Sequence, residues 1–304
     1  MTSKFRHFGL ALCLSLALMP GYGPAQTVFA TNEVVDFDSP EGWAMAFMTT
    51  AGLNLGQLPP DETRFGDLAL AAELGSIPRL NDSQQQVGFG GFKDEDLNKS
   101  PVFGRARASL GLFWDVTAEL SWTPPVEIDG ARPDGLWGLA LSRPLAGNGA
   151  WGLGLRLFAL EGAVRADVTC SADVASQPPG SPGNPFSCIE PSRDRLEMNH
   201  YGAELMLSFS EVAFNLEPWL AVASARMDPF TQIKARLQDS IERSTIDSRG
   251  TTTTYSAGLV YRFSDSWRVN LATSYTPLDV ERPPGNRGGR ENFWNARLGL
   301  TWDL

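Results

Sequence analysis

Charged side chains recur at alternate positions along several segments of the chain. In residues 116–123, Glu119 shares a phase with small polar residues, while Leu120 and Trp122 belong to the apolar phase. Because alternate residues of a β-strand point to opposite faces, such a segment carries charge on one face only. The charged residues of the polar phase are Asp67, Glu73, Glu119, Glu204 and Asp303 among the acids, and Arg105, Arg107, Arg156, Arg262, Arg268 and Arg297 among the bases.

Carboxylates and guanidinium groups gathered inside a closed structure suit two purposes. They can pair with one another in a polar network that fills the interior, because an isolated buried charge is costly and arginine binds carboxylates in a two-pronged geometry. They can instead line a narrow pore and select what passes through it. The sequence favours the paired network, and the selective pore remains the alternative.

His200 is the only histidine after the first 25 residues, and it shares a face with Glu204. A histidine held by a carboxylate can act as a general base, so a hydrolase at the outer rim is one interpretation. A histidine in this setting more often joins a hydrogen-bonded network. We therefore expect the protein not to be an enzyme.

The elements that would position these residues are strands. The alternating segments run to roughly 9 to 12 residues, the length at which a tilted strand crosses a bilayer. Aromatic residues such as Trp122, Trp267 and Trp302 stand near segment ends, as in the interfacial girdles of membrane barrels. The predicted strands are 66–77, 101–112, 115–125, 136–144, 151–168, 197–209, 216–227, 251–263, 267–278 and 293–304. This pattern predicts an all-β fold, a transmembrane antiparallel up-and-down β-barrel with 10 strands.

Connections between these segments alternate between short and long, which is typical of periplasmic turns and extracellular loops. Residues 39–56 fit this scheme less well. Ser39 as N-cap, Pro40 at the first helical position and Glu41 in the first turn indicate a short helix. Read as a strand, the segment would belong to a 12-stranded alternative. We expect residues 26–65 to form a periplasmic N-terminal segment with this helix, and residues 66–304 to form the barrel.

The first 25 residues read as a secretory signal peptide, with Lys4 and Arg6 before an apolar run that is too short to span a membrane. Export places the chain in an oxidising compartment. Cys170 and Cys188 flank a loop rich in proline, glycine and serine, so we expect them to form a disulfide.

Net charge excludes a nucleic-acid partner. The formal charge is −10, and removal of Lys4 and Arg6 with the signal peptide leaves 23 − 35 = −12, whereas nucleic-acid binding needs a basic face. The glycine pattern at 147–152 fits a dinucleotide motif, but it lies in a turn between two strands rather than between a strand and a helix. We expect no cofactor and no metal site.

The segment "ARLGLTWDL" at 296–304 resembles the carboxy-terminal insertion signal of Gram-negative outer-membrane β-barrel proteins. Apolar residues alternate through Leu298, Leu300, Trp302 and Leu304, although a final aromatic residue is usual where this chain has Leu304. The resemblance implies the outer membrane of a Gram-negative bacterium. It also implies outer-membrane lipid, the barrel-assembly machinery and periplasmic chaperones as partners.

These observations lead to three functional hypotheses. The first is a narrow channel or transporter for a small solute of unknown identity. The second is a structural or adhesive barrel, whose closed lumen supports extracellular loops. The third is the outer-rim hydrolase that uses His200.

Overall fold

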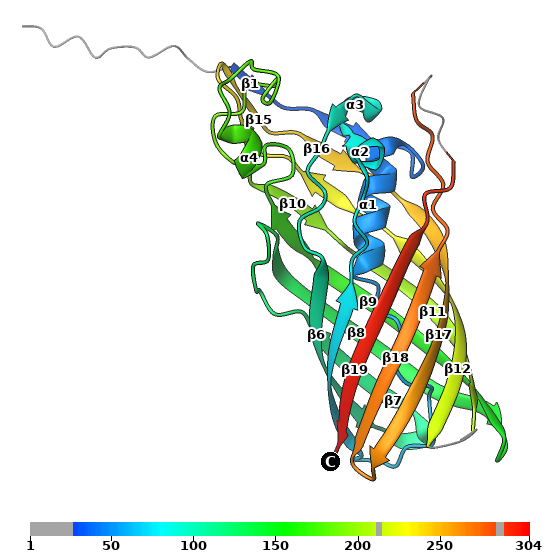
Figure 1. Cartoon of the computed structure of the whole chain (residues 1–304). Helices are drawn as coiled ribbons and strands as arrows, with labels where there is room; N and C mark the ends of the chain where they lie inside the picture. The colour runs from blue at the N-terminus through cyan, green and yellow to red at the C-terminus, as the bar shows by residue number, and fades with distance from the viewer. Residues whose placement is uncertain (1–26, 211–214, 284–288) are drawn as a thin grey trace, which may run out of the picture.

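A computed structural model describes residues 27–210, 215–283 and 289–304, and its dominant feature is a closed antiparallel β-barrel (Figure 1). The predicted signal peptide lies outside these residues. The barrel strands are β3 (Leu68–Ser76), β6 (Val102–Gly111), β7 (Thr117–Trp122), β8 (Arg132–Gly147), β9 (Trp151–Ala166), β11 (His200–Phe209), β12 (Leu216–Met227), β17 (Gly250–Ser264), β18 (Trp267–Thr276) and β19 (Phe293–Asp303). Pairing of β19 with β3 and of β9 with β11 completes the ring. The predicted count of 10 strands is confirmed, and the 12-stranded alternative is not.

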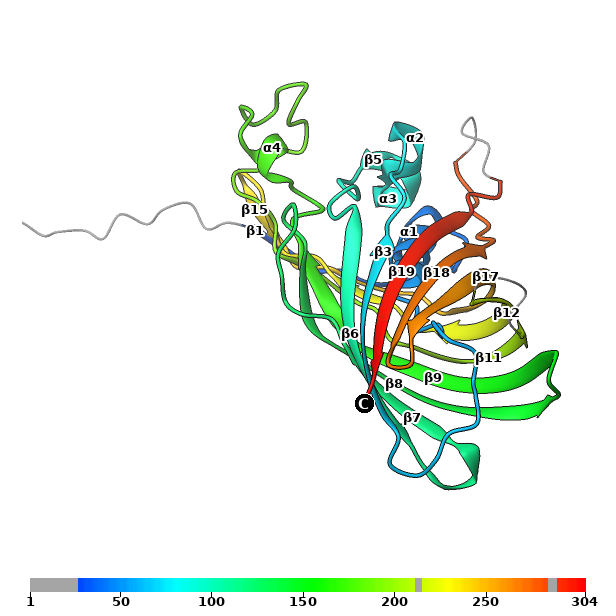
Figure 2. The same cartoon turned by 60° about the horizontal axis from the view of Figure 1, so that its bottom comes forward.

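The two ends of the barrel differ in what connects the strands. Short connections such as that between β17 and β18 lie at one end with Leu304, and we call this the short-turn end (Figures 1 and 2). At the opposite, long-loop end, β9 rises above the ring and continues into an open sheet. This sheet contains β10 (Asp194–Glu197), β13 (Phe230–Gln232), β16 (Thr245–Asp247) and β2 (Asn32–Val34).

Smaller elements complete the long-loop end. They are the sheet of β1 (Thr27–Phe29), β14 (Ala235–Arg236) and β15 (Ser240–Glu242), the pair β4 (Gln86–Val87) and β5 (Lys93–Asp94), and the single turns α2 (Asp82–Gln85), α3 (Gly88–Gly91) and α4 (Ala172–Ala175). A 3-10 turn, η1 (Phe113–Asp115), joins β6 to β7 at the short-turn end.

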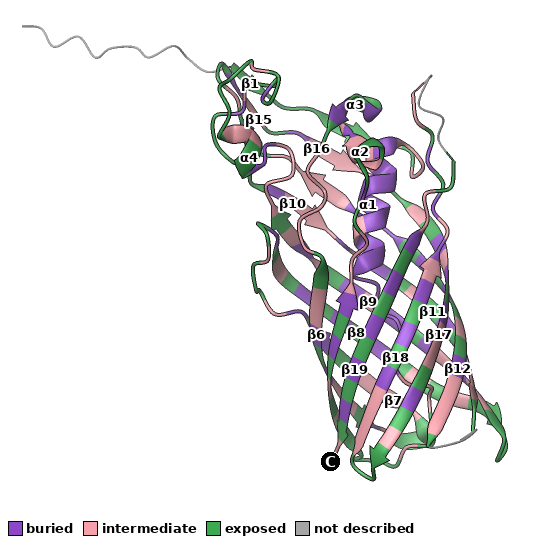
Figure 3. Cartoon of the chain, in the orientation of Figure 1, coloured by how far each residue is buried: buried purple, intermediate pink, exposed green. Residues whose placement is uncertain are grey.

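Strand faces follow the predicted alternation, with exposed and buried residues succeeding one another along β18 and β19 (Figure 3). The exposed phase is apolar, and it includes Leu298, Leu300 and Trp302. Aromatic pairs lie on this face near strand ends, with ring centroids 5.8 Å apart for Trp122 and Trp137 and 5.7 Å apart for Trp267 and Trp302. Such a surface suits contact with lipid, because exposure of this much apolar area to water would cost free energy.

The predicted N-terminal helix is present as α1 (Pro40–Ala51), with Ser39 accepting a hydrogen bond from the Gly42 amide and with proline in the first turn. The sequence predicts this helix within a periplasmic segment, but the structure places it in the barrel at the long-loop end, opposite the short turns that the sequence assigns to the periplasm. Described residues from Thr27 onward begin at the long-loop end, α1 lies in the barrel mouth, and the chain then passes down the lumen (Figures 1 and 2).

Burial explains this placement. Trp43 and Phe47 of α1 are almost inaccessible to solvent, and Phe47 meets Phe293 of the barrel wall at a ring distance of 5.0 Å. In α1 apolar side chains occur all round the helix, so it needs an enclosed site rather than a surface. Among the described residues, no helix is both long and apolar enough to cross a membrane.

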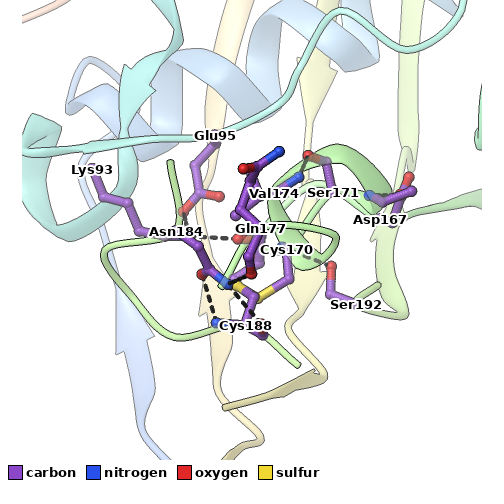
Figure 4. Close-up of a disulfide and its surroundings, with 12 residues drawn as sticks. Lys93, Glu95, Asp167, Cys170, Ser171, Val174, Gln177, Asn184, Cys188 and Ser192 are labelled. Atoms are coloured by element: carbon purple, nitrogen blue, oxygen red, sulfur yellow. Dashed lines mark hydrogen bonds and ion pairs between the residues drawn. A yellow bond between two sulfur atoms is a disulfide. The ribbon is translucent and has the colours of Figure 1, made fainter. Parts of the chain in front are cut away.

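The Cys170–Cys188 disulfide, which the sequence predicts, closes the longest loop of the long-loop end (Figure 4). Asn184 organises the same loop, because its side chain donates to the carbonyls of Gln177 and Cys188 and accepts from the Cys188 amide. The loop is therefore held by a covalent bond and by a buried amide at once.

We expect the double variant Cys170→Ser and Cys188→Ser to loosen this loop without opening the barrel. Closing a loop of this length with a disulfide contributes about 3 kcal/mol in the chain-entropy model. Limited proteolysis should therefore cut 171–187 at least roughly ten times faster in the variant. The unheated protein should still migrate faster on gels than the boiled protein, and equal cleavage rates in variant and parent would show that Asn184 alone orders the loop.

Candidate functional site

Residues 52–60, here called the plug segment, occupy the barrel lumen in an extended path below α1. Arginines of the wall bind its main-chain carbonyl oxygens. Arg105 donates to the Gly52 oxygen at 2.6 Å and to the Leu53 oxygen at 3.3 Å. Lower in the lumen, Arg107 donates to the Leu55 oxygen at 2.9 Å.

Two further arginines complete this contact. Arg156 donates to the Asn54 carbonyl, and Arg297 donates to the Leu53 carbonyl at 3.2 Å. The four guanidinium groups come from β6, β9 and β19, so they surround the plug segment from different sides of the ring. Each lies at an inward position of its strand, as the alternation predicts.

Glu73 and Glu119 supply the opposite charge. Glu73, whose side chain is fully buried, lies 2.6 Å from Arg107, 3.3 Å from Arg297 and 3.8 Å from Arg105. Glu119 bridges Arg107 at 2.6 Å and Arg156 at 2.8 Å. A buried charge is tolerated only when it is paired and hydrogen-bonded, and both carboxylates meet these conditions through their arginine partners.

His200 and Glu204 also bind the plug segment. The His200 ring accepts from the Asn54 amide at 3.2 Å through Nε2, and its Nδ1 lies 2.9 Å from the Met198 carbonyl. Glu204 accepts from the Gly56 amide at 2.7 Å. His200 therefore lies inside the lumen rather than at the outer rim, with Nε2 bound to the plug segment and Nδ1 to the wall at Met198.

The other residues of the predicted lumen set lie apart from this network. Arg268 pairs with Asp303, and Arg262 lies 3.8 Å from Glu217 with both side chains partly exposed. Asp67 is exposed, and it caps a turn by accepting from the Arg64 amide at 2.7 Å. It takes no part in the lumen network because it precedes the strand, which begins at Leu68.

Apolar contacts in the lumen are a feature that the sequence analysis missed. Leu53 and Leu55 of the plug segment pack with Phe158, Ala223 and Met227 of the wall. Farther down, Leu58 packs against Met206 and Trp219. The sequence signal was the leucines of "GLNLGQLPP". They pack against inward apolar residues of the wall, which would be exposed to water if the lumen were filled with it.

A cavity of about 890 Å³ lies at the long-loop end, above the plug segment, and we call it the loop-end cavity. Met45, Met48 and Gly52 form its boundary on the side of α1. Its other walls come from the segment 87–105, from 123–136, from β3 and β9 and from strands of the open sheet, and most of their side chains are apolar.

One side of the loop-end cavity coincides with a break in the barrel wall. Strand β6 pairs with β3 from Val102 onward, but its pairing with β7 begins only at Ala106, opposite Trp122. Beyond Trp122 the chain leaves β6 but still follows β8, where the Thr123 amide donates to the Leu136 carbonyl. The gap between 102–105 and 123–126, here called the wall gap, borders the cavity on both sides.

The charged part of the cavity lies near β5. Lys93 donates to Glu95 at 2.7 Å and to the Thr169 carbonyl at 2.8 Å. Burial raises the pKa of Glu95 to about 8, against the lowering effect of Lys93. Within the described ranges, no group of three or more His, Cys, Asp and Glu side chains is arranged to hold a metal ion.

A closed barrel with an apolar outer face, aromatic belts and a charged, filled interior defines an outer-membrane β-barrel protein of a Gram-negative bacterium. The family model described as "TonB dependent receptor-like, beta-barrel" matches residues 36–304, and the chain belongs to this family. A comparison with curated protein sequences found no match.

Several solved structures are similar to this chain. An outer membrane channel from Pseudomonas putida F1 has 12% sequence identity and a TM-score of 0.43, over 83% of this chain and 100% of that one. The translocator domain of the autotransporter NalP from Neisseria meningitidis has 9% identity and a TM-score of 0.37, over 88% and 99%. The outer membrane protease OmpT from Escherichia coli has 10% identity and a TM-score of 0.34, over 79% and 94%.

The charge network predicts an unequal response to removal of two carboxylates. Glu73→Gln leaves three arginines short of a buried counter-charge, so we expect it to lower the free energy of unfolding by about 3 to 5 kcal/mol. Glu217→Gln is the matched control, because its partner Arg262 is partly exposed and such pairs contribute about 1 kcal/mol or less. Urea unfolding in micelles measures both, and equal losses would contradict a supporting role for Glu73.

Proposed function

We propose that this protein is an outer-membrane transporter for a small solute, and that the plug segment is the gate of its lumen. The observation that carries the proposal is the continuity of cavity and gate. Gly52 borders the loop-end cavity and also binds Arg105 in the lumen. A solute that occupies the cavity therefore rests on the same chain that closes the path below.

The contacts of the plug segment suit a gate. Its carbonyl oxygens are held by hydrogen bonds from arginines, which water can replace when the segment moves. The arginines keep carboxylate partners in its absence, since Arg107 binds both Glu73 and Glu119. A lumen without the plug segment would thus remain a paired, polar passage rather than a set of unpaired charges.

A structural or adhesive barrel is the second candidate. It is favoured by the extent of ordered structure at the long-loop end, where the open sheet and the disulfide loop present a broad surface (Figure 1). This function requires no movement of the plug segment. Conductance therefore separates the two candidates.

Assembly is part of the proposal. Delivery by periplasmic chaperones and insertion by the barrel-assembly machinery are supported by the outward position of Leu298, Leu300 and Trp302 on the last strand. The same strand closes the ring by pairing with β3.

We expect Arg105→Ala to raise the frequency of open-channel events in planar bilayers. The change removes hydrogen bonds to Gly52, Leu53 and Asn54, while Glu73 keeps Arg107 and Arg297 as partners. Arg268→Ala is the matched control, since Arg268 pairs with Asp303 rather than with the plug segment. Conductance of Arg105→Ala no greater than that of the control would reject the gate and favour the structural barrel.

A reversible lock gives a second test of the gate. A Cβ placed on Gly299 would lie 2.9 Å from Cδ of Gln57, so Gln57→Cys with Gly299→Cys can join the plug segment to the wall. In the Arg105→Ala background, oxidation of this pair should abolish the open events and reductant should restore them. Each single cysteine variant, treated with the same oxidant and reductant, provides the control for effects on the Cys170–Cys188 disulfide.

A further inference from the structure

Glu95 carries a polar atom that the protein itself does not use. Its Oε1 accepts from Lys93, but its Oε2 is shielded from solvent and has no hydrogen-bond partner among the described residues. The side chain borders the loop-end cavity and is 11% exposed. Leaving a buried acceptor without a donor is costly, which makes Glu95 a candidate contact for a ligand.

The groups around Glu95 do not supply the missing donor. Lys93 on β5 is already bound to Glu95 Oε1 and to the Thr169 carbonyl, and it lies 5.3 Å from the centre of the Phe186 ring. Asp194 on β10 accepts from the Thr169 amide, the Ser192 hydroxyl and the Lys234 amide. Figure 4 shows Lys93 and Glu95 beside the loop that the disulfide closes, with Ser192 just beyond that loop in the chain.

Charge near Glu95 is unbalanced. Glu95, Asp194 and Glu242 of β15 border the cavity near the ammonium group of Lys93. Lys99, the other lysine of the lining, is already paired with Asp96 and Asp167. Burial raises the pKa of Glu95 to about 8, and the charges of Asp194 and Glu242 act in the same direction. The pKa of Glu242 is also raised by burial, with a further contribution from Glu33 on β2. An added cation would relieve this repulsion.

Most of the cavity wall is apolar. The side chains that give it this character come from α1, the loop 87–105, β9, β10 and β16, and they include Met45, Met48, Leu97, Val164, Leu196 and Ile246. The apolar lining continues to the wall gap, where Val102 and Val126 are exposed. At about 890 Å³ the cavity has the size of a site for a small organic molecule.

We propose that the loop-end cavity binds an amphiphilic amine, with Glu95 turning its carboxylate into the cavity to pair with the ammonium group and with the apolar body along the methionine and leucine side chains toward the wall gap. An amphiphilic carboxylate has the same body but would meet three carboxylates. A small hydrophilic amine could pair with Glu95 but would leave the apolar wall uncovered. Transport of this amine rests on the proposed function, whereas its binding in the cavity does not.

The test uses the full-length exported protein in lipid nanodiscs and two matched probes, 4-phenylbutylamine and 4-phenylbutyrate. Isothermal titration calorimetry, with empty nanodiscs as the blank, should give saturable binding of the amine and none of the carboxylate. Glu95→Gln should weaken amine binding about 10- to 100-fold, the range for loss of one charge-assisted hydrogen bond. Glu190→Gln, a change at an exposed carboxylate outside the cavity, should leave the affinity unchanged.

The pH dependence gives an independent readout. Binding of the ammonium group requires ionised Glu95, whose pKa in the empty cavity is about 8. Affinity should therefore rise by up to about tenfold per pH unit from pH 6 to pH 8 and then level off, with release of a proton on binding below pH 8. In Glu95→Gln this rise should disappear, although Asp194, Glu242 and Lys93 are still present.

Three results would overturn the inference. They are absence of amine binding, binding of the carboxylate with equal affinity, and an unchanged affinity in Glu95→Gln. Failure of the gate is recognised separately, because the gate is measured by open-channel events and the site by amine binding. Oxidation of the Gln57→Cys and Gly299→Cys pair should leave amine binding intact. Amine binding without open-channel events would keep the site and reject transport.

Discussion

Hydrogen bonds from wall arginines to the carbonyl oxygens of a chain inside the lumen are the interaction on which the rest of the structure depends. A small barrel must fill its own interior, and inward charges must find partners there. The plug segment meets both needs, because it brings apolar side chains to Phe158 and Met206 and acceptors to Arg105 and Arg297. Placement of α1 in the mouth follows, since the plug segment continues directly from it.

That arrangement also joins the two ends of the molecule. One strand, β9, belongs to the ring along its lower part, where it pairs with β11, and to the open sheet along its upper part, where it pairs with β10. The N-terminal residues add β2 to the far edge of that sheet before they enter the barrel as α1. The plug segment and the edge strand of the sheet that borders the loop-end cavity are therefore joined by α1 in one stretch of chain.

The barrel was predictable from the sequence because strand alternation is a local pattern. Inward positions of Glu73, Arg107 and Glu119 follow from it directly, and so does their mutual pairing. The position of the plug segment was not predictable in this way, since arginines bind carbonyl oxygens that every residue has. The loop-end cavity was not predictable either, because segments such as 87–105 that form it show no regular alternation of polar and apolar residues. Glu95 became a candidate only through its burial.

The brevity of β7 has a consequence for the surrounding bilayer. β7 has 6 residues, whereas β17 has 15, and a strand needs roughly 9 to 11 residues to cross the hydrocarbon layer. Backbone groups without partners are not left in lipid, so the wall gap must lie at the level of the headgroups. The membrane therefore has to be thinner beside β7, or the barrel axis has to lean toward that side. Either response would disturb the packing of the lipids beside β7.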